Sequence, residues 1–325
     1  MSKIKLFTHT DLDGVGCAIL AYLVFGKENV DVEYCNYDDV NEKVEKFWKH
    51  VGDAEYDAVY ITDISISEDL AEQITAHTGV RKWHLFDHHA TALGLNKYDW
   101  CEVRVNGISG EMKTSGTEVF FIHLALNVYF KFKPTQENNL VRFVSIVRDY
   151  DTWKWKELGE EGTVCKQVND LFHMYGREKF IDWAIDQICR TDYSFPLFVF
   201  PNFTETDIAL LKQKQNDIDR YIETKDKQLF TQIDGLGNKY GVVFAEQYFS
   251  ELGNRLCELH PELAYVAMID VSDGTVSYRA TRNDIDLGKE IASRFGGGGH
   301  PKAAGSQFAV EAVREKIVTE AFKER

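Results

Sequence analysis

Short apolar runs alternate with amphipathic stretches through the first third of the chain. Strand-like runs lie at Ile4–Thr8, Val30–Asn36, Ala58–Thr62 and Lys82–Phe86. Between them, apolar positions recur at helical spacing near residues 15–26, 40–50 and 68–78. This alternation is typical of βαβ units and therefore predicts a parallel sheet.

The pattern changes after this region. Residues 115–190 are predicted to be mostly helical, opening at an N-cap in Ser115-Gly-Thr-Glu118. Pro196 and Pro201 mark a break, and the run from Thr204 to about Phe230, free of Pro and Gly, predicts one long connecting helix. Beyond Gly235, strands are predicted near residues 241–246, 264–270 and 275–281.

The sequence therefore predicts an α/β protein of two domains. We expect a parallel-sheet domain over residues 1–195, a helical linker over residues 196–235 and a smaller α/β domain over residues 236–325. The length of 325 residues suits two domains of ordinary size.

Composition indicates a soluble globular protein, with 44% hydrophobic and 27% charged residues. No apolar run approaches the length of a bilayer, and the N-terminus MSKIKLFTHTDLDG does not resemble a signal peptide. The 6 cysteines are scattered without a C-x-x-C pair, which favours free thiols in a reducing compartment. We therefore expect a cytoplasmic protein without a membrane partner.

The net charge of −15 makes the chain a poor candidate for binding long nucleic acids, which require a basic surface. Such a chain is suited to concentrating divalent cations. Bound cations could in turn supply the positive charge that a short phosphate-bearing substrate needs.

Acidic and histidine side chains follow three of the first four predicted strands. A single aspartate in such a place is usually a helix cap, but runs of them are harder to explain that way. Ligands of open parallel sheets bind beyond the carboxyl ends of the strands, so these clusters could converge on one site. The candidates are His9, Asp11 and Asp13 after the first strand, Asp63 after the third, Asp87, His88 and His89 after the fourth, and Asp149 and Asp151 at a later helix end.

This set of side chains suits hard divalent ions. Carboxylates with imidazoles and no thiolates favour a Mn²⁺-like or Mg²⁺-like ion over structural zinc. The candidates are too many for one ion, which indicates two ions about 3.5–4 Å apart that share a bridging aspartate.

A second candidate site lies near the C-terminus, in Phe295-Gly-Gly-Gly-Gly-His300-Pro-Lys302-Ala-Ala-Gly305. Glycines lack a Cβ, so the backbone N–H groups of Gly297, Gly298 and Gly299 could approach a phosphate closely. His300 and Lys302 add donors, and Arg279 on the preceding strand could bind a phosphate or carboxylate bidentately. A flexible linker is the alternative, but the segment lacks the serines and repetition of linkers.

The motifs HTDLDG, TDIS, FDHHAT and RDYDT resemble the four motifs of the DHH phosphoesterases. SYRAT and FGGGGHPKAAG resemble the DHHA1 substrate-binding domain of one branch of that family. The resemblance covers nearly the whole chain and is strongest to the nanoRNases, which degrade very short RNAs. Cyclic-dinucleotide phosphodiesterases are close relatives.

The resemblance implies a role for each candidate. Asp63 would bridge the two ions, His89 would face the scissile phosphate and Asp87 would orient the loop. The first motif has one residue between its histidine and first aspartate, where several relatives have three. The first ion would be held by His9, Asp11 and Asp63, and the second by Asp13, Asp63, His88 and either Asp151, which the following threonine favours, or Asp149.

The resemblance also implies an activity. We expect two Mn²⁺ ions, with Mg²⁺ as the alternative, and hydrolysis of RNA or DNA oligonucleotides or dinucleotides of about two to five nucleotides to nucleoside monophosphates. Cyclic-dinucleotide phosphodiesterase and phosphoadenosine-phosphate phosphatase activities stay open, as does a non-enzymatic, metal-dependent nucleotide sensor. A homodimer is compatible with the sequence.

Overall fold

The computed structural model describes residues 3–51, 55–76, 80–107, 110–127, 134–190 and 199–323. The chain divides into two compact units, Met1–Leu211 and Lys212–Arg325. The expected domain boundary after residue 195 lies outside the described residues. The division between the units falls inside helix α8 (Glu205–Asp226), the long helix predicted between the two domains.

The first unit contains a five-stranded sheet in the order β2-β1-β3-β4-β5, and every neighbouring pair is parallel. The prediction of a parallel sheet is therefore confirmed. The short strand β5 was not predicted, because three residues are too few to show a period. The strands are β1 (Ile4–His9), β2 (Val30–Cys35), β3 (Ala58–Thr62), β4 (Trp83–Asp87) and β5 (Cys101–Val103).

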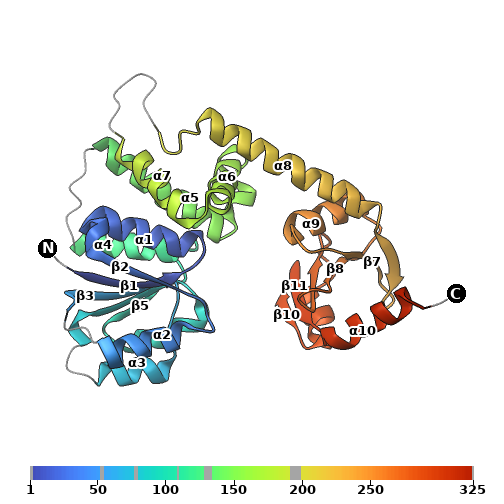
Figure 1. The fold of residues 1–325 in the computed structure, drawn as a ribbon, viewed down its shortest axis with the longest axis horizontal. Coiled ribbons are helices and arrows are strands. Elements are labelled where there is room, and N and C mark those ends of the chain that lie inside the picture. The colour runs from blue at the N-terminus through green and yellow to red at the C-terminus, as the bar shows by residue number, and fades with distance from the viewer. Residues whose placement is uncertain are drawn as a thin grey trace. The chain divides into compact units, whose positions relative to one another are not determined.

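Helices cover both faces of this sheet. Figure 1 shows α1 and α4 over one face and α2 and α3 over the other. Alternate side chains of β1 separate accordingly, since Leu6 joins the core beneath α1 and Phe7 joins the core beneath α2. The helices are α1 (Leu12–Phe25), α2 (Val40–Lys46), α3 (Glu68–Thr75), α4 (Gly116–Asn127), α5 (Pro134–Asp151), α6 (Glu160–Tyr175) and α7 (Arg177–Cys189).

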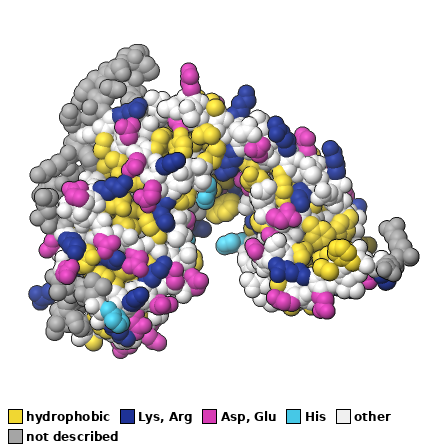
Figure 2. Space-filling view, viewed as in Figure 1, with side chains coloured by type: hydrophobic (Ala, Val, Ile, Leu, Met, Phe, Trp, Pro, Cys, Tyr) yellow, Lys and Arg dark blue, Asp and Glu magenta, His cyan; other side chains and the backbone are white. Residues whose placement is uncertain are grey.

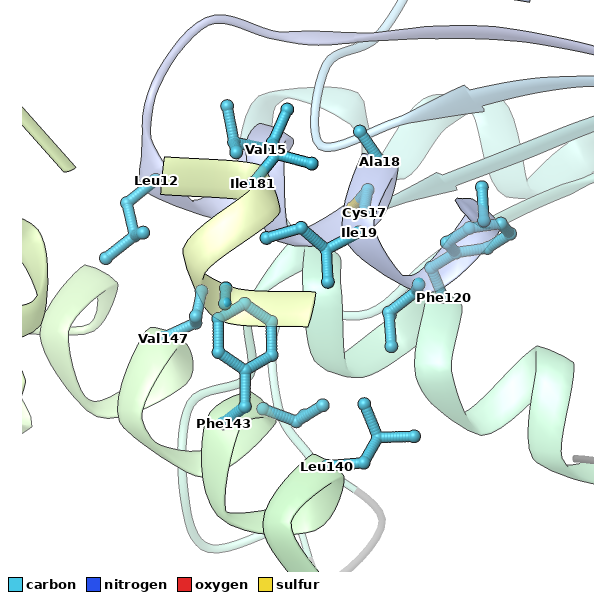
Figure 3. Close-up of a cluster of buried hydrophobic side chains, with 14 of the residues drawn as sticks. Leu12, Val15, Cys17, Ala18, Ile19, Phe120, Leu140, Phe143, Val147 and Ile181 are labelled. Atoms are coloured by element: carbon cyan, nitrogen blue, oxygen red, sulfur yellow. The ribbon is translucent and has the colours of Figure 1, made fainter. Parts of the chain in front are cut away.

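The larger core lies between the sheet and the helical layer of α1, α4, α5 and α7. Figure 3 shows Val15 and Ile19 of α1 in the same cluster as Phe120, Phe143 and Ile181, and all five are fully buried. Helix α1 is apolar on nearly all sides because it is covered on nearly all sides. This packing holds the start of α1 against the end of β1, where the first acidic motif lies.

The second unit is built on a six-stranded mixed sheet in the order β10-β11-β9-β8-β7-β6. Only β7 and β8 pair in parallel; the other neighbours are antiparallel. The strand β6 falls within the residues expected to form the linker. The strands are β6 (Phe230–Ile233), β7 (Lys239–Phe244), β8 (Val266–Asp270), β9 (Thr275–Arg279), β10 (Gly298–His300) and β11 (Ala303–Gln307), and the helices are α9 (Phe249–Leu259) and α10 (Val310–Ala321).

Among the described helices, none combines the length and apolar composition needed to span a lipid bilayer.

Candidate metal centre and active site

The carboxyl ends of β1, β3 and β4 meet at one edge of the first sheet. Two buried threonines join the first two strands there: the Thr8 hydroxyl donates to the Thr62 carbonyl at 3.1 Å, and the Thr62 hydroxyl donates to Thr8 Oγ1 at 2.9 Å. These bonds hold the following residues, His9 and Asp63, at neighbouring positions on the edge.

One group of candidate ligands comprises His9, Asp11 and Asp63, whose ligand atoms all lie within 4.8 Å of one another. His9 Nδ1 is 2.9 Å from Asp11 Oδ2 and 3.8 Å from Asp63 Oδ2. Asp11 also caps α1 by accepting the Gly14 N–H at 3.0 Å. One carboxylate thus serves both the helix cap and the acidic cluster.

A second group comprises Asp13, His88 and Asp151, also within 4.8 Å of one another. His88 Nε2 lies 3.6 Å from Asp13 Oδ2, 3.6 Å from Asp151 Oδ2 and 3.3 Å from Asp63 Oδ1. The two oxygens of Asp63 therefore face different groups.

The two late aspartates lie in different surroundings. Asp151 ends α5 within the second group, whereas the carboxylate of Asp149 pairs with Arg148 at 2.8 Å. Residues two apart on a helix point in very different directions, so one turn of α5 cannot present both side chains to the same ion.

The start of α4 supports the second group. Asp13 accepts the N–H groups of Gly116 at 2.7 Å and Thr117 at 2.8 Å, which are among the unpaired donors of the first helical turn. These bonds connect residues about a hundred positions apart and hold the Asp13 carboxylate in place.

Asp63 has an unusual backbone conformation, with φ of 58°. Its N–H donates to the Phe86 carbonyl at 2.9 Å, which continues the β3–β4 pairing past the end of β3. Gly116 lies so close that a Cβ at that position would be 2.5 Å from the Cβ of Asp63. Only glycine allows α4 to approach the aspartate this closely.

The carboxylates repel one another at this edge. Burial and the neighbouring charges of Asp13 and Asp11 raise the pKa of Asp63 well above its ordinary value. Burial and the same two charges raise the pKa of Asp151 to about 8. Burial also opposes ionisation of Asp11, but the close approach and charge of His9 hold the pKa of Asp11 below its ordinary value.

His89 belongs to a third group, with Asp63, Asp87 and His88, whose ligand atoms also lie within 4.8 Å of one another, but it forms a different set of bonds. Its Nδ1 is 2.7 Å from Oδ1 of the buried Asp87, and the Ser65 hydroxyl donates to the other Asp87 oxygen at 2.5 Å. Burial alone would raise the pKa of Asp87, but the hydrogen bond with His89 lowers it below its ordinary value. The same hydrogen bond raises the pKa of His89. Asp87 thereby orients the imidazole so that Nε2 is the atom left to contact other groups.

Tyr37 contacts His89 at this Nε2 atom. Its hydroxyl is 3.1 Å from His89 Nε2, and its ring centroid is 5.0 Å from that of His9. A cavity of about 280 Å³ lies beside this contact, and Tyr37, Ser65, Asp87 and His89 contribute to its lining.

The glycine segment of the second unit is partly a strand. Gly298, Gly299 and His300 form β10, which pairs with β11 at the edge of the sheet, and all three are exposed. A Cβ at Gly297 would lie 2.0 Å from the Gly305 carbonyl oxygen, whereas one at Gly298 would meet nothing within 4 Å. Close packing against the backbone explains why position 297 is a glycine. Of the two glycines, only Gly298 has open space beside it in which a ligand could lie.

The two cations predicted to bind substrate are engaged with protein groups. Arg279 donates to the Tyr278 carbonyl at 2.8 Å and to the Ser250 hydroxyl at 3.1 Å. Lys302 donates to the Thr281 carbonyl at 2.8 Å and to a neighbouring carbonyl. A phosphate would compete with these bonds.

Comparison with known proteins places the chain in a family. It is 37% identical over 321 residues to oligoribonuclease NrnB of Bacillus subtilis (strain 168), an alignment that covers 98% of this chain and 76% of that protein. The chain belongs to the DHH/DHHA1 phosphoesterases, in the nanoRNase branch.

Solved structures support the same fold. A DHH domain from a member of the S1p family of ribosomal proteins has a TM-score of 0.61 at 15% identity, covering 100% of this chain and 87% of that chain. The exonuclease RecJ bound to manganese has a TM-score of 0.54 at 14% identity, covering 100% of this chain and 91% of that chain. No protein-family model matches the chain.

The residues of the DHH domain fit divalent metal ions. Three buried atoms in the acidic cluster have no hydrogen-bond partner: His9 Nδ1, Asp63 Oδ2 and His88 Nε2. A buried polar atom without a partner is costly, and all three are of a kind that binds hard or intermediate metal ions. A cation would satisfy them and would offset the repulsion among the carboxylates.

Sequence patterns did not identify two residues of this site. Tyr37 follows β2, whose end is followed by Asp38 and Asp39 but by no histidine, and the position of β2 in the sheet order was the available signal. Gly116 was recognised only as part of a helix start, because its contact with Asp63 depends on the packing of α4.

Metal affinity is expected to rise with pH. Asp151 has a raised pKa of about 8, so it is mostly protonated at pH 6 and an ion must displace its proton. The dissociation constant for Mn²⁺ should fall between pH 6 and 8, by up to about tenfold per pH unit for each proton displaced. Calorimetry in two buffers of different ionisation enthalpy measures the released protons, and binding without proton release would contradict this expectation.

Two neighbouring glycines of the DHHA1 segment are expected to respond differently to alanine. Gly297→Ala should lower the free energy of unfolding by about 1–3 kcal/mol, because its Cβ would overlap the Gly305 carbonyl. Gly298→Ala should change stability by less than about 0.5 kcal/mol. Urea denaturation monitored by circular dichroism checks both values, and equal losses would show that Gly298 is also needed for packing.

Proposed function

We propose that this chain is a metal-dependent phosphodiesterase that hydrolyses oligonucleotides of about two to five nucleotides to nucleoside monophosphates. The observation that carries the proposal is the convergence of two ligand groups on Asp63, with three buried ligand atoms lacking partners. The similarity to NrnB, whose name describes an oligoribonuclease, supports the same substrate class.

The two groups define two ion positions. We assign His9, Asp11 and Asp63 to one ion, and Asp13, Asp63, His88 and Asp151 to the other, with Mn²⁺ the preferred metal and Mg²⁺ the alternative. When bound, the pair of ions supplies an ionised water at neutral pH and stabilises negative charge on the reacting phosphate. Asp149 is not assigned to either ion, because its carboxylate pairs with Arg148.

His89 would act on the substrate rather than on a metal. Its Nδ1 is bound to Asp87, so Nε2 is the atom that can donate a proton or hydrogen bond to a phosphate oxygen. The Tyr37 hydroxyl lies against this nitrogen at 3.1 Å and marks where an oxygen atom is accommodated. Ser65 and Asp87 hold the imidazole in this orientation.

The charge distribution favours short substrates. Figure 2 shows acidic and basic side chains interspersed over the visible face of the first unit, without a continuous basic surface. The net charge of −15 provides no compensating charge for phosphates beyond those at the metal centre. Each additional nucleotide outside the site should therefore add little binding energy.

Hydrolysis is expected to be fastest with the shortest substrates. With Mn²⁺, kcat/KM for a 5′-labelled RNA dinucleotide should exceed that for a 24-nucleotide RNA by about a hundredfold or more, because the longer chain adds unpaired phosphate repulsion. Denaturing gel electrophoresis of both substrates measures the ratio. Equal rates would contradict the proposed substrate class.

The same assay separates the alternatives. Preferential cleavage of a cyclic dinucleotide would indicate the cyclic-dinucleotide phosphodiesterase activity, and phosphate release from bisphosphorylated adenosine would indicate the phosphatase. Binding of nucleotides without turnover, in the presence of either metal, would indicate the sensor.

The two late aspartates provide a matched pair of variants. Asp151→Asn should remove a metal ligand and lower kcat by roughly a thousandfold, because loss of one ion removes several kcal/mol of transition-state stabilisation. Asp149→Asn should lose its ion pair with Arg148 but retain both ions. Metal content after dialysis, measured by plasma mass spectrometry, checks both, and the reverse pattern would move the assignment to Asp149.

A further inference from the structure

Trp153 is an exposed aromatic residue next to the metal centre. It lies two positions after Asp151, and 55% of its surface is exposed. Large aromatic residues that remain exposed beside a catalytic centre commonly contact a ligand, although single exposed hydrophobic residues are not unusual elsewhere.

The backbone at Trp153 is strained. Its φ is 64°, a left-handed conformation that costs a bulky side chain roughly 1–2 kcal/mol and costs glycine almost nothing. Of the three described non-glycine residues with positive φ, one is Asp63 of the metal centre and another is Trp153, two residues after Asp151. Strain of this kind is often retained where it places a side chain for function.

A cavity of about 350 Å³ lies beside the Trp153 ring. Met112, Lys113, Arg148, Thr152 and Lys154 contribute to its lining, together with three acidic residues. Two of those acids are neutralised, since Asp149 pairs with Arg148 and Glu157 pairs with Lys154. The volume is at the lower end for ligand pockets, which suits one nucleoside rather than two.

The cavity lining carries equal numbers of acidic and basic side chains, so it is less acidic than the chain as a whole. The Lys156 ammonium lies 4.4 Å from the centroid of the Trp153 ring. No ion pair of Lys113 is found within the described ranges, and its side chain lines the same cavity as the Trp153 ring. An aromatic face with nearby lysines is the usual means of binding a single-stranded nucleotide without selecting its base.

We propose that Trp153 stacks on the base of a nucleotide next to the scissile phosphate, and that Lys113 contacts a phosphate of the same nucleotide. This inference rests on the proposed function, since it assigns a nucleotide subsite to that metal centre. Stacking explains why the chain places a tryptophan in a conformation that favours glycine. It also supplies binding energy that does not depend on base identity, as a degradative enzyme requires.

The test measures binding of adenosine 5′-monophosphate and ribose 5-phosphate to the full-length protein by equilibrium dialysis with Mg²⁺. Trp153→Gly removes the ring and relieves the backbone, so the fold should be retained, with an unchanged or higher melting temperature. Its dissociation constant for adenosine 5′-monophosphate should rise roughly five- to 150-fold, while that for ribose 5-phosphate stays unchanged. Lys113→Ala is the matched variant and should weaken both ligands alike.

The outcomes separate this inference from the proposed function. Equal binding of adenosine 5′-monophosphate by wild type and Trp153→Gly, or no binding by wild type, would overturn the stacking role even if dinucleotides are hydrolysed. An equal loss for both ligands in Trp153→Gly would also overturn it, because the ring would then act on phosphate or fold. Weakened binding of the base-containing ligand alone would support stacking even if wild type hydrolyses no dinucleotide.

Discussion

The buried carboxylate of Asp63 is the group on which the arrangement of the first unit depends. Its two oxygens face His9 on one side and His88 on the other, at 3.8 Å and 3.3 Å. Asp11 and Asp13 are close enough to raise its pKa. Several carboxylates in a buried space repel one another unless a cation or protons neutralise them. This repulsion destabilises the fold locally, and bound metal ions would remove it.

Packing around Asp63 supplies the support for this arrangement. The fully buried threonine pair joins β1 to β3, Gly116 admits the start of α4, and the first-turn amides of α4 hold Asp13. These contacts join segments that are far apart along the chain, and the apolar core between the sheet and α1, α4, α5 and α7 fixes their positions. The acidic edge therefore depends on a core that contains none of its residues.

The two adjacent histidines, His88 and His89, have different surroundings, which suit different functions. His88 Nε2 is buried, without a hydrogen-bond partner, among three carboxylates, as a metal ligand would be. His89 has its Nδ1 bound to Asp87 and its Nε2 against an exposed tyrosine, as a residue that meets substrate would be. The two histidines are consecutive in the chain, and their side chains meet different groups because successive side chains after a strand point in different directions.

Much of the fold and of the candidate ligand set could be predicted from the sequence. The alternation of apolar runs predicted the four longer strands of the first sheet, and the acids and histidines after them included every candidate of the two ligand groups except Asp151, which ends a helix. Motifs in an ordered series carry this information because strand ends of a parallel sheet meet at one edge. The short strands β5 and β10 were not predicted, because three residues are too few to show a period. In β10, the glycines are also more typical of a loop than of a strand.

Only the tertiary structure decided which of those side chains lie together. It placed Asp151 in the cluster and Asp149 on Arg148, where the sequence favoured Asp151 only through the following threonine, because the rotation of α5 depends on its packing. It brought Tyr37 to His89 and Trp153 to a cavity that Lys113 also lines, and it assigned Gly297 to backbone packing. Sequence periodicity determines which face of an element is buried, whereas contacts between distant segments depend on how complete elements pack together.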